Sequence, residues 1–212
     1  MRIYVAGHLE DVASVQHVQS AVVAAGHDVT LDWTRGPDSA ITNYATADAL
    51  SIEIVEDPSP EALLAAAQIW AAATARRDGL SEPVAPERKL PGLRTALAVP
   101  GARLHLATQG DLPVGFVVLV PSGSRLELRY LGVTPSAWGD GVATQLLDHV
   151  TSCATRGGFD AAELWVLADN DRAIAVYMRA GWVLTSDTKS QIDTQRTETR
   201  LELRVGGHAR RR

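Results

Sequence analysis

The stretch that most constrains the fold runs from residue 126 to residue 158 and predicts a strand, a glycine turn and a helix. Hydrophobic and polar residues alternate over 126–133, which is typical of a half-buried strand, and Pro135 stops that strand. Gly157 and Gly158 end the predicted helix. The apolar residues of that helix recur with helical spacing at Ala143, Leu146, Leu147, Val150 and Ala154.

The turn between them, residues 138–143, places two glycines at the start of the predicted helix. A glycine backbone can take unusual φ/ψ angles and lets a ligand approach closely, while the free N–H groups and the dipole of a helix N-terminus attract negative charge. The pattern therefore favours a site for a phosphate group. An ordinary tight strand-to-helix turn stays open as the alternative, because short glycine motifs are weak signals.

Three motifs follow one another along the chain. They are Val133-Thr-Pro135, then Gly139-x-Gly141-x-Ala143, then Asn170-x-x-Ala173-x-x-x-Tyr177-x-x-Ala180-Gly181-Trp182. In order and spacing they resemble the GCN5-related N-acetyltransferase (GNAT) family, and the resemblance covers roughly residues 51–205. It implies an α/β (α+β) fold, with a mixed, mainly antiparallel central sheet flanked by helices.

The resemblance also implies a cofactor and its contacts. In that family the glycine turn binds the pyrophosphate of acetyl-coenzyme A, the preceding strand aligns the pantetheine arm, and the helix of the last motif carries a general acid. The family usually opens the turn with Arg or Gln, whereas this chain has Trp138, and Asp140 would repel phosphate unless its side chain points to water. The cofactor-binding residues implied here are Leu131, Gly132, Val133, Trp138, Gly139, Asp140, Gly141, Val142, Ala143, Thr144, Asn170, Ala173 and Tyr177.

Acetyl transfer to an amine needs groups that accept a proton, hold the acyl carbonyl and protonate the leaving thiolate. Glu127 occupies the strand position that resembles the family's general base, and its alternative role is a surface glutamate paired with Arg129. Tyr177 resembles the general acid, since a phenol of pKa about 10 can protonate a thiolate. A core tyrosine is its alternative. A backbone N–H within 131–133 is the expected carbonyl donor, with Gly132 allowing a β-bulge that turns it out of the ladder.

Composition limits the other classes of protein. With 212 residues, 46% of them hydrophobic, the chain can bury a sizeable core. A net charge of −5 argues against a general nucleic-acid binder, which usually has a basic face. The single cysteine, Cys153, excludes an internal disulfide and a cysteine-based zinc site, so we expect no metal. This cysteine is expected to be a small core or boundary residue.

The rest of the region 51–205 predicts further elements. Strands are expected near 52–55, 103–108, 114–120 and 161–167, the last one parallel to 126–133. A helix is expected over 61–77, on which Trp70 packs in the core or, alternatively, forms a substrate wall. Residues 80–92 contain three prolines and are not expected to form one long element. His105 is expected on a solvated strand face, with a place at the acceptor site as the alternative.

The two ends of the chain differ from its centre. Residues 1–45 predict a β-α-β appendage whose Ile3-Tyr-Val-Ala-Gly7 and Gly26-His-Asp-Val-Thr-Leu-Asp-Trp33 resemble the start of nucleoside 2-deoxyribosyltransferase-like proteins. No activity is transferred, because the later carboxylate nucleophile of that family has no match here. Residues 182–185 and 199–205 predict a closing hairpin with a long polar loop over 186–198, and residues 206–212 predict a disordered basic tail.

Together these features predict an N-acetyltransferase that moves an acetyl group from acetyl-coenzyme A to a primary amine by direct transfer in a ternary complex. The alternatives are a non-catalytic acyl-coenzyme A binding or sensory module and, on the N-terminal segment, a nucleoside-handling protein. A small amine, an antibiotic and a protein N-terminus are all open as acceptors, and so is a homodimer. The chain has no long apolar run and no signal-peptide pattern, so we expect a cytoplasmic protein without nucleic-acid or membrane partners.

Overall fold

The computed structural model describes residues 50–55, 58–191 and 195–205. All of them belong to Leu50–Arg212, the second of the two units into which the chain divides. The expected N-terminal appendage (1–45) and basic tail (206–212) lie outside the described residues, so both stay predictions.

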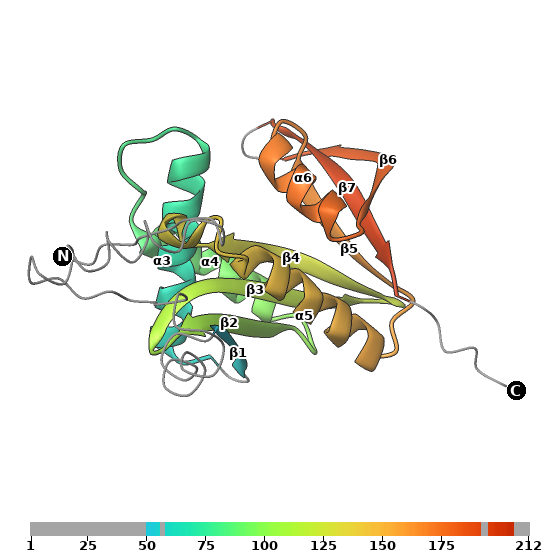
Figure 1. Ribbon diagram of the computed structural model, residues 1–212, viewed down its shortest axis with the longest axis horizontal. Helices are drawn as coiled ribbons and strands as arrows, with labels where there is room; N and C mark the ends of the chain where they lie inside the picture. The colour runs from blue at the N-terminus through green and yellow to red at the C-terminus, as the bar shows by residue number, and fades with distance from the viewer. Residues whose placement is uncertain (1–49, 56–57, 192–194, 206–212) are drawn as a thin grey trace, which may run out of the picture. The chain divides into compact units, whose positions relative to one another are not determined.

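A seven-stranded sheet forms the centre of the fold, in the order β1-β2-β3-β4-β5-β7-β6 (Figure 1). Neighbouring strands are antiparallel except β4 and β5, which are parallel because a helix crosses over between them. This confirms the expected mixed, mainly antiparallel sheet. The strands are β1 (Leu50–Val55), β2 (Arg103–Gln109), β3 (Leu112–Ser122), β4 (Arg125–Val133), β5 (Ala161–Leu167), β6 (Val183–Ser190) and β7 (Thr197–Arg204).

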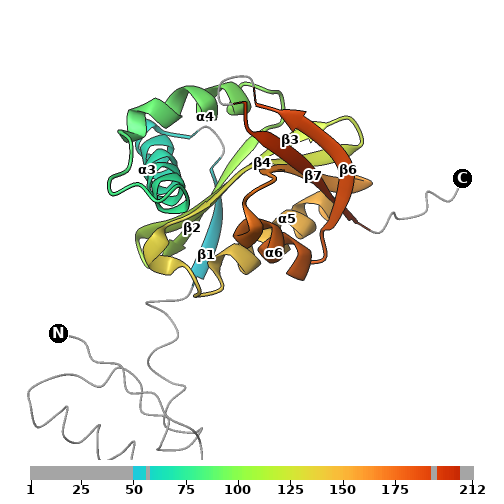
Figure 2. The same ribbon diagram turned by 90° about the horizontal axis from the view of Figure 1, so that it is seen from above.

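Helices cover both faces of the sheet. Helices α3 and α4 pack on one face, and α5 and α6 pack on the other (Figure 2). Short side chains begin two of them: the Ser59 hydroxyl accepts a hydrogen bond from the Ala62 N–H, and the Asn170 side chain accepts one from the Ala173 N–H. The helices are α3 (Pro60–Arg77), η3 (Pro86–Lys89), α4 (Leu90–Leu97), η4 (Pro135–Ala137), α5 (Val142–Arg156) and α6 (Asp171–Arg179).

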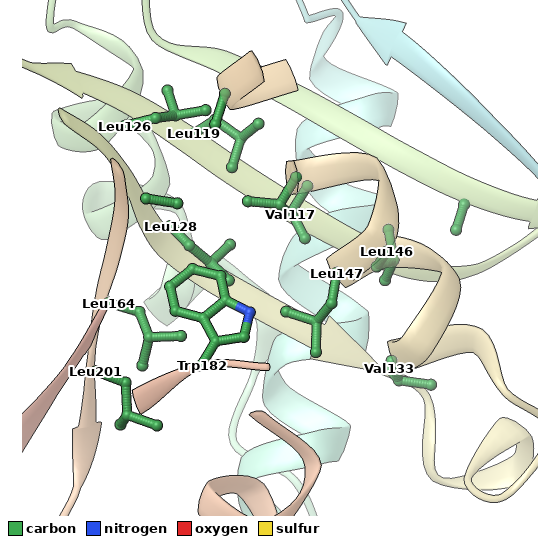
Figure 3. Packing of buried hydrophobic residues seen from close by; sticks show 14 of the residues in the cluster. Val117, Leu119, Leu126, Leu128, Val133, Leu146, Leu147, Leu164, Trp182 and Leu201 are labelled. Atoms are coloured by element: carbon green, nitrogen blue, oxygen red, sulfur yellow. The ribbon is translucent and has the colours of Figure 1, made fainter. Parts of the chain in front are cut away.

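Each face of the sheet has its own hydrophobic core. On the α5 and α6 side, the buried indole of Trp182 lies among Leu128, Leu164 and Leu201 (Figure 3). On the α3 and α4 side, the fully buried ring of Phe116 lies in a second cluster. The central strands are therefore buried on both faces, which explains why β3 is almost continuously apolar.

A β-bulge interrupts β4 between Leu128 and Tyr130. The pairing with β3 shifts there and leaves Arg129 as the extra residue. Because of this shift, Tyr130 contacts the core on the α3 side, whereas Leu128 lies in the core on the α5 side. The expected bulge at Gly132 was wrong. Gly132 pairs regularly with Phe116, whose ring occupies the space that a side chain would need.

Two other expectations can be compared with the structure. The polar loop predicted over 186–198 is wrong in extent, because β6 runs to Ser190 and β7 begins at Thr197. Residues 80–92 form no single long element, as expected, but the sequence did not predict α4. Pro91 lies in the first turn of α4, where a backbone N–H would have no helical partner. Among the residues that the structure describes, no helix is long and apolar enough to cross a membrane.

The contact at Gly132 makes a stability prediction. A Cβ atom there would lie 2.4 Å from Cε1 of Phe116, and this ring is fully buried. We expect Gly132→Ala to lower the free energy of unfolding by about 1–3 kcal/mol, the usual effect of overpacking a core. The free energy of unfolding of the native chain and the variant is measured by urea denaturation.

The matched variant is Gly132→Ala combined with Phe116→Leu, which removes the clashing ring edge. The combined loss should be smaller than the sum of the two single losses, because the two side chains compete for the same space. Additive losses would show that the contact does not determine the residue at position 132.

Candidate active site

Strands β4 and β5 run together at one end and then separate (Figure 1). The pairing recorded between them joins Arg125–Leu128 to Ala161–Leu164. Beyond Leu128, β4 continues beside β3 as far as Val133, while β5 continues beside β7. Within the described ranges, the second half of β4 therefore has a strand partner on one side only, and backbone groups on its other side are available to a ligand.

The direction of the β4 backbone follows from one hydrogen bond. The Thr134 N–H donates to the Val114 oxygen at 2.8 Å, so it faces β3. Because backbone groups alternate sides along an antiparallel strand, the Gly132 N–H also faces β3, and the N–H groups of Leu131 and Val133 face the side that β5 has left. Of the three strand residues expected to hold the cofactor, Leu131 and Val133 thus present an amide and Gly132 does not.

The glycine turn leaves the start of α5 open. Gly139 and Gly141 have φ angles of 106° and 81°, where side chains are strained, and a Cβ at either position would meet nothing within 4 Å. Gly141 is the N-cap of α5 and has no side chain to accept from the first amides. The first helical bond is from the Gln145 N–H to the Gly141 oxygen. The amides of residues 142–144 are therefore free of helical partners and point out of the helix end.

Buried side chains hold this helix end in place. Val142 is 1% exposed and packs in the core on the α5 side. Its side chain therefore anchors the turn, and only its backbone can reach a ligand. Asp140, which would repel phosphate from inside the turn, is exposed at the surface, as are Gly139 and Gly141. Ala143 is half-buried and Thr144 is exposed.

Trp138 departs from the family pattern and has two partners. Its indole Nε1 donates to the Val133 oxygen at 2.7 Å, which ties the turn to the end of β4. The guanidinium of Arg172, from the first turn of α6, lies 4.3 Å from the centre of the indole ring. A positive charge is therefore present beside the turn although Trp138 carries none. Arg172 was not predicted from the sequence, where its only signal was its position two residues after Asn170.

Helix α6 positions the last motif. Asn170 begins the helix, and Ala173 donates its N–H to the Asn170 side chain at 3.3 Å. The ring of Tyr177 is partly buried and lies 6.2 Å, centre to centre, from the ring of Trp182. Loss of solvation raises the pKa of Tyr177 to about 12. The phenol is thus held protonated, and it is a weaker acid than a tyrosine with the ordinary pKa of about 10.

Glu127 is held by the bulge residue. The Arg129 guanidinium donates two hydrogen bonds of 2.6 Å, one to each carboxylate oxygen. The Glu127 side chain is 13% exposed and that of Arg129 is 38% exposed. The pairing that formed the alternative interpretation of Glu127 is therefore present. Two of the four lone-pair positions of the carboxylate stay free for a water molecule or an amine.

Aromatic residues lie on the same side of β4 as Glu127. The Tyr130 and Trp70 rings are 4.4 Å apart, centre to centre, and the Lys89 ammonium lies 4.8 Å from the Trp70 ring. Burial raises the pKa of the Tyr130 hydroxyl. Trp70 is half-buried, so it is neither a fully buried core residue nor an exposed wall. The contact between Tyr130 and Trp70 was not predicted from the sequence, because it depends on the bulge in β4.

His105 lies on the other face of the sheet. It is 2% exposed, and its Nδ1 lies 2.8 Å from Nε2 of His149 on α5. The expected solvated strand histidine was wrong, because α5 covers that face of β2. The alternation of residues along β2 predicted the correct face of the sheet for His105. It did not predict that α5 covers this face.

The groups present fit a coenzyme A ester. Free amides at a helix N-terminus, with Arg172 beside them, suit a pyrophosphate, and the unpaired amides of β4 suit the amide carbonyls of a pantetheine arm. The buried Nε1 of Trp182 has no hydrogen-bond partner within the described part of the chain, and the indole ring lies beside Leu128 and Leu164, where the pairing of β4 with β5 ends. A buried donor without a partner is rare, and a ligand or a water molecule there would satisfy it.

Comparison with known proteins agrees with this geometry. The acetyltransferase (GNAT) family model matches residues 64–182, more than half of the chain. A mycothiol acetyltransferase from Jonesia denitrificans is 42% identical over 84 residues, which cover 37% of this chain and 27% of that protein. The matching part thus spans about a quarter of the length of this curated relative.

Two solved structures share the fold. The ribosomal-protein-S18-alanine N-acetyltransferase from Escherichia coli is 18% identical with a TM-score of 0.59, covering 76% of this chain and 98% of its own. A putative acetyltransferase from Salmonella typhimurium, solved with its cofactor acetyl-CoA, is 16% identical with a TM-score of 0.54, covering 76% and 97%. At these identities the likeness concerns the fold alone.

The open turn leads to a binding prediction. Gly141→Val places a branched side chain at a φ angle of 81°, so the turn must change its backbone and move the amides of residues 142–144. We expect the affinity for coenzyme A to fall tenfold or more, about 1.4 kcal/mol, by calorimetry.

Gly123→Val is the matched control. Gly123 lies in the β3–β4 hairpin with a φ of 60° and equally open surroundings, so it reports backbone strain without a ligand contact. Equal affinity losses in the two variants, or no loss in Gly141→Val, would contradict the assignment of the turn.

Proposed function

Because the chain belongs to the acetyltransferase (GNAT) family, whose members use acetyl-coenzyme A as donor, we propose that it acetylates a primary amine by direct transfer in a ternary complex. The observation that carries the proposal is the early end of the β4–β5 pairing, together with the uncapped N-terminus of α5. We expect the reaction to take place in the cytoplasm, where acetyl-coenzyme A is available.

The chain would hold the donor mainly through its backbone. Amides 142–144 would bind the pyrophosphate, with the Arg172 side chain adding a positive charge beside Trp138. The outward amides of Leu131 and Val133 would bind the pantetheine arm or the acyl carbonyl. When bound, acetyl-coenzyme A supplies an activated acyl carbonyl and a thiolate leaving group. Asn170 and Ala173 would border the same space from the start of α6.

Tyr177 is proposed to donate a proton to the leaving sulfur. A pKa of about 12 means that the phenol keeps its proton at every pH at which the fold is expected to work. Full transfer to a thiolate is less favourable than from a tyrosine of ordinary pKa, because the acid is weaker. A hydrogen bond from Tyr177 that strengthens as negative charge develops on sulfur needs no such transfer, and the raised pKa does not oppose it.

Glu127 is proposed to accept the proton of the amine through a water molecule. Arg129 occupies one lone pair on each carboxylate oxygen and fixes the direction of the others. The ion pair is partly exposed, so its expected contribution to the free energy of unfolding is small, about 0–1 kcal/mol. A catalytic role of Glu127 therefore predicts a large loss of kcat on substitution, whereas a structural role predicts only a small loss in the free energy of unfolding.

The acceptor is proposed to approach from the α3 side, between residues 76–95 and the β6–β7 connection. Arg196 of that connection lies 3.4 Å from Asp78 at the end of α3 and 2.9 Å from Asp169 before α6. These ion pairs support the proposal because they bring the two segments together. The half-buried pair of Trp70 and Tyr130 lies on the same side of β4 as Glu127.

Glu127→Gln and Arg129→Gln form a matched pair, because each removes one partner of the same ion pair. If Glu127 accepts a proton, we expect kcat to fall about 10²-fold or more in Glu127→Gln and much less in Arg129→Gln. Steady-state kinetics measure both variants, with urea unfolding as the control for stability. Equal kcat values in the two variants would leave Glu127 with a structural role.

The proposed function is tested by coenzyme A release from acetyl-coenzyme A across a panel of small amines, aminoglycosides and peptides with free N-termini. The native chain should show amine-dependent release. Tyr177→Phe should lower kcat about 10²–10⁴-fold with little change in cofactor affinity, because only the hydroxyl is lost. Since its pKa is about 12, Tyr177 should cause no alkaline fall in rate up to about pH 10.

Coenzyme A binding without release for any amine would instead indicate a non-catalytic binding module. Normal kcat in a folded Tyr177→Phe variant, with chemistry as the slow step, would remove the tyrosine from the mechanism. Loss of stability with normal turnover would assign it to the core, where a lost hydrogen bond costs about 1 kcal/mol.

A further inference from the structure

Three side chains with metal-binding atoms meet under α5, away from the proposed active site. They are His105 of β2 and His149 and Cys153 of α5. Nε2 of His149 lies 2.8 Å from Nδ1 of His105 and 3.4 Å from Sγ of Cys153, and all three donor atoms lie within 4.8 Å of one another. His149 follows Gly141 by eight residues, so the cluster is about 12 Å along the helix from the glycine turn.

The fold explains why these residues meet. His149 and Cys153 are four residues apart and therefore lie on one face of α5. The side chain of His105 points to the same face of the sheet as Ala107, which belongs to the core on the α5 side. His105 is 2% exposed, and the other two residues are partly buried. No part of the acetyl-transfer chemistry uses any of the three.

We propose that His105, His149 and Cys153 bind a Zn²⁺ ion, with a water molecule as the fourth ligand. Zinc prefers imidazole nitrogen and thiolate sulfur at about 2.0–2.1 and 2.3 Å in tetrahedral geometry, which places such donors about 3.3–3.6 Å apart. The distance of 3.4 Å from Sγ of Cys153 to Nε2 of His149 already matches, whereas Sγ and the His105 nitrogen, within 4.8 Å of each other, must come about 1 Å closer. The two imidazoles must separate by about half an ångström, as the ion replaces the proton that they share.

Burial and nearby charge disfavour the protonated form of both imidazoles. Burial, the neighbouring His149 and the guanidinium groups of Arg103 and Arg156 lower the pKa of His105 to about 4, and burial and Arg156 lower the pKa of His149. Arg156, although exposed, also repels a cation at this place.

The thiol must lose its proton on binding. Burial raises the pKa of Cys153, so the free thiol is protonated. Binding forms a bond from zinc to sulfur, breaks the S–H bond and releases one proton to solvent. The Arg156 guanidinium, 4.0 Å from the sulfur, favours the thiolate. A surface hollow of about 440 Å³, lined by His149, Thr151, Ser152, Thr155 and Arg156, gives solvent access to the cluster.

A metal site was not expected from the sequence, because a single cysteine excludes sites built from several cysteines. The two ligands on α5 are close in sequence, but His105 precedes the nearer one, His149, by 44 residues. Only the packing of α5 on β2 brings it to them. Zinc would link a strand to the helix that crosses over the sheet, so we expect a stabilising role separate from acetyl transfer.

The test uses the full chain, purified without a histidine tag and treated with a chelator. We expect Co²⁺ to produce a thiolate-to-cobalt charge-transfer band, and Zn²⁺ to remove that band and to raise the melting temperature. Zn²⁺ should bind once at this cluster by calorimetry. Cys153→Ser should abolish the band, and Cys153→Ser and His149→Gln should each lower zinc affinity at least tenfold.

Ser152→Ala is the control, because its exposed hydroxyl lies next to Cys153 on α5 and only binds the Asp148 oxygen. It should bind zinc like the native chain. The absence of a cobalt band in the native chain would overturn the proposal without the need for any variant. Zinc binding that is equally tight in Cys153→Ser and His149→Gln would overturn it too, because the ion would then lie elsewhere.

Discussion

A backbone N–H group that is taken out of water needs a hydrogen-bond partner, and the site depends on amides of β4 that have no strand partner. β5 accompanies β4 only as far as Leu128 and then continues with β7. The amides of Leu131 and Val133 face the side that β5 leaves. An extended ligand with amide carbonyls can accept hydrogen bonds from these amides in place of β5. A peptide that adds to the edge of a sheet binds in the same way.

Several packing contacts keep the site open. The ring of Trp182 fills the core next to Leu128 and Leu164, where the two strands separate (Figure 3). Val142 fixes the start of α5 in the same core, while Gly141 leaves the first amides of α5 without a side-chain cap. The same helix therefore contributes its buried face to stability and its N-terminus to binding. Its middle and its last turn carry His149 and Cys153, which meet His105 of β2.

The sequence predicted what depends on neighbours along the chain. The alternation of 126–133, the glycines of the turn and the helical spacing after it gave the strand, turn and helix in their observed places. The sequence did not predict features that depend on packing against a residue far along the chain. The bulge lies at Arg129 and not at Gly132, because the pairing with β3 decides it. His105 is buried because α5 covers it, and Arg172 lies over Trp138 because α6 packs beside the turn.

The account is tested most directly by amide hydrogen exchange of the native chain with and without coenzyme A. We expect coenzyme A to slow exchange at the amides of Leu131, Val133, Val142, Ala143 and Thr144, because these groups have no other partner among the residues that the structure describes. The Gly132 amide, which faces β3, should exchange slowly in both states. Protection on other elements, with these five amides unchanged, would contradict a cofactor site built from β4 and the start of α5.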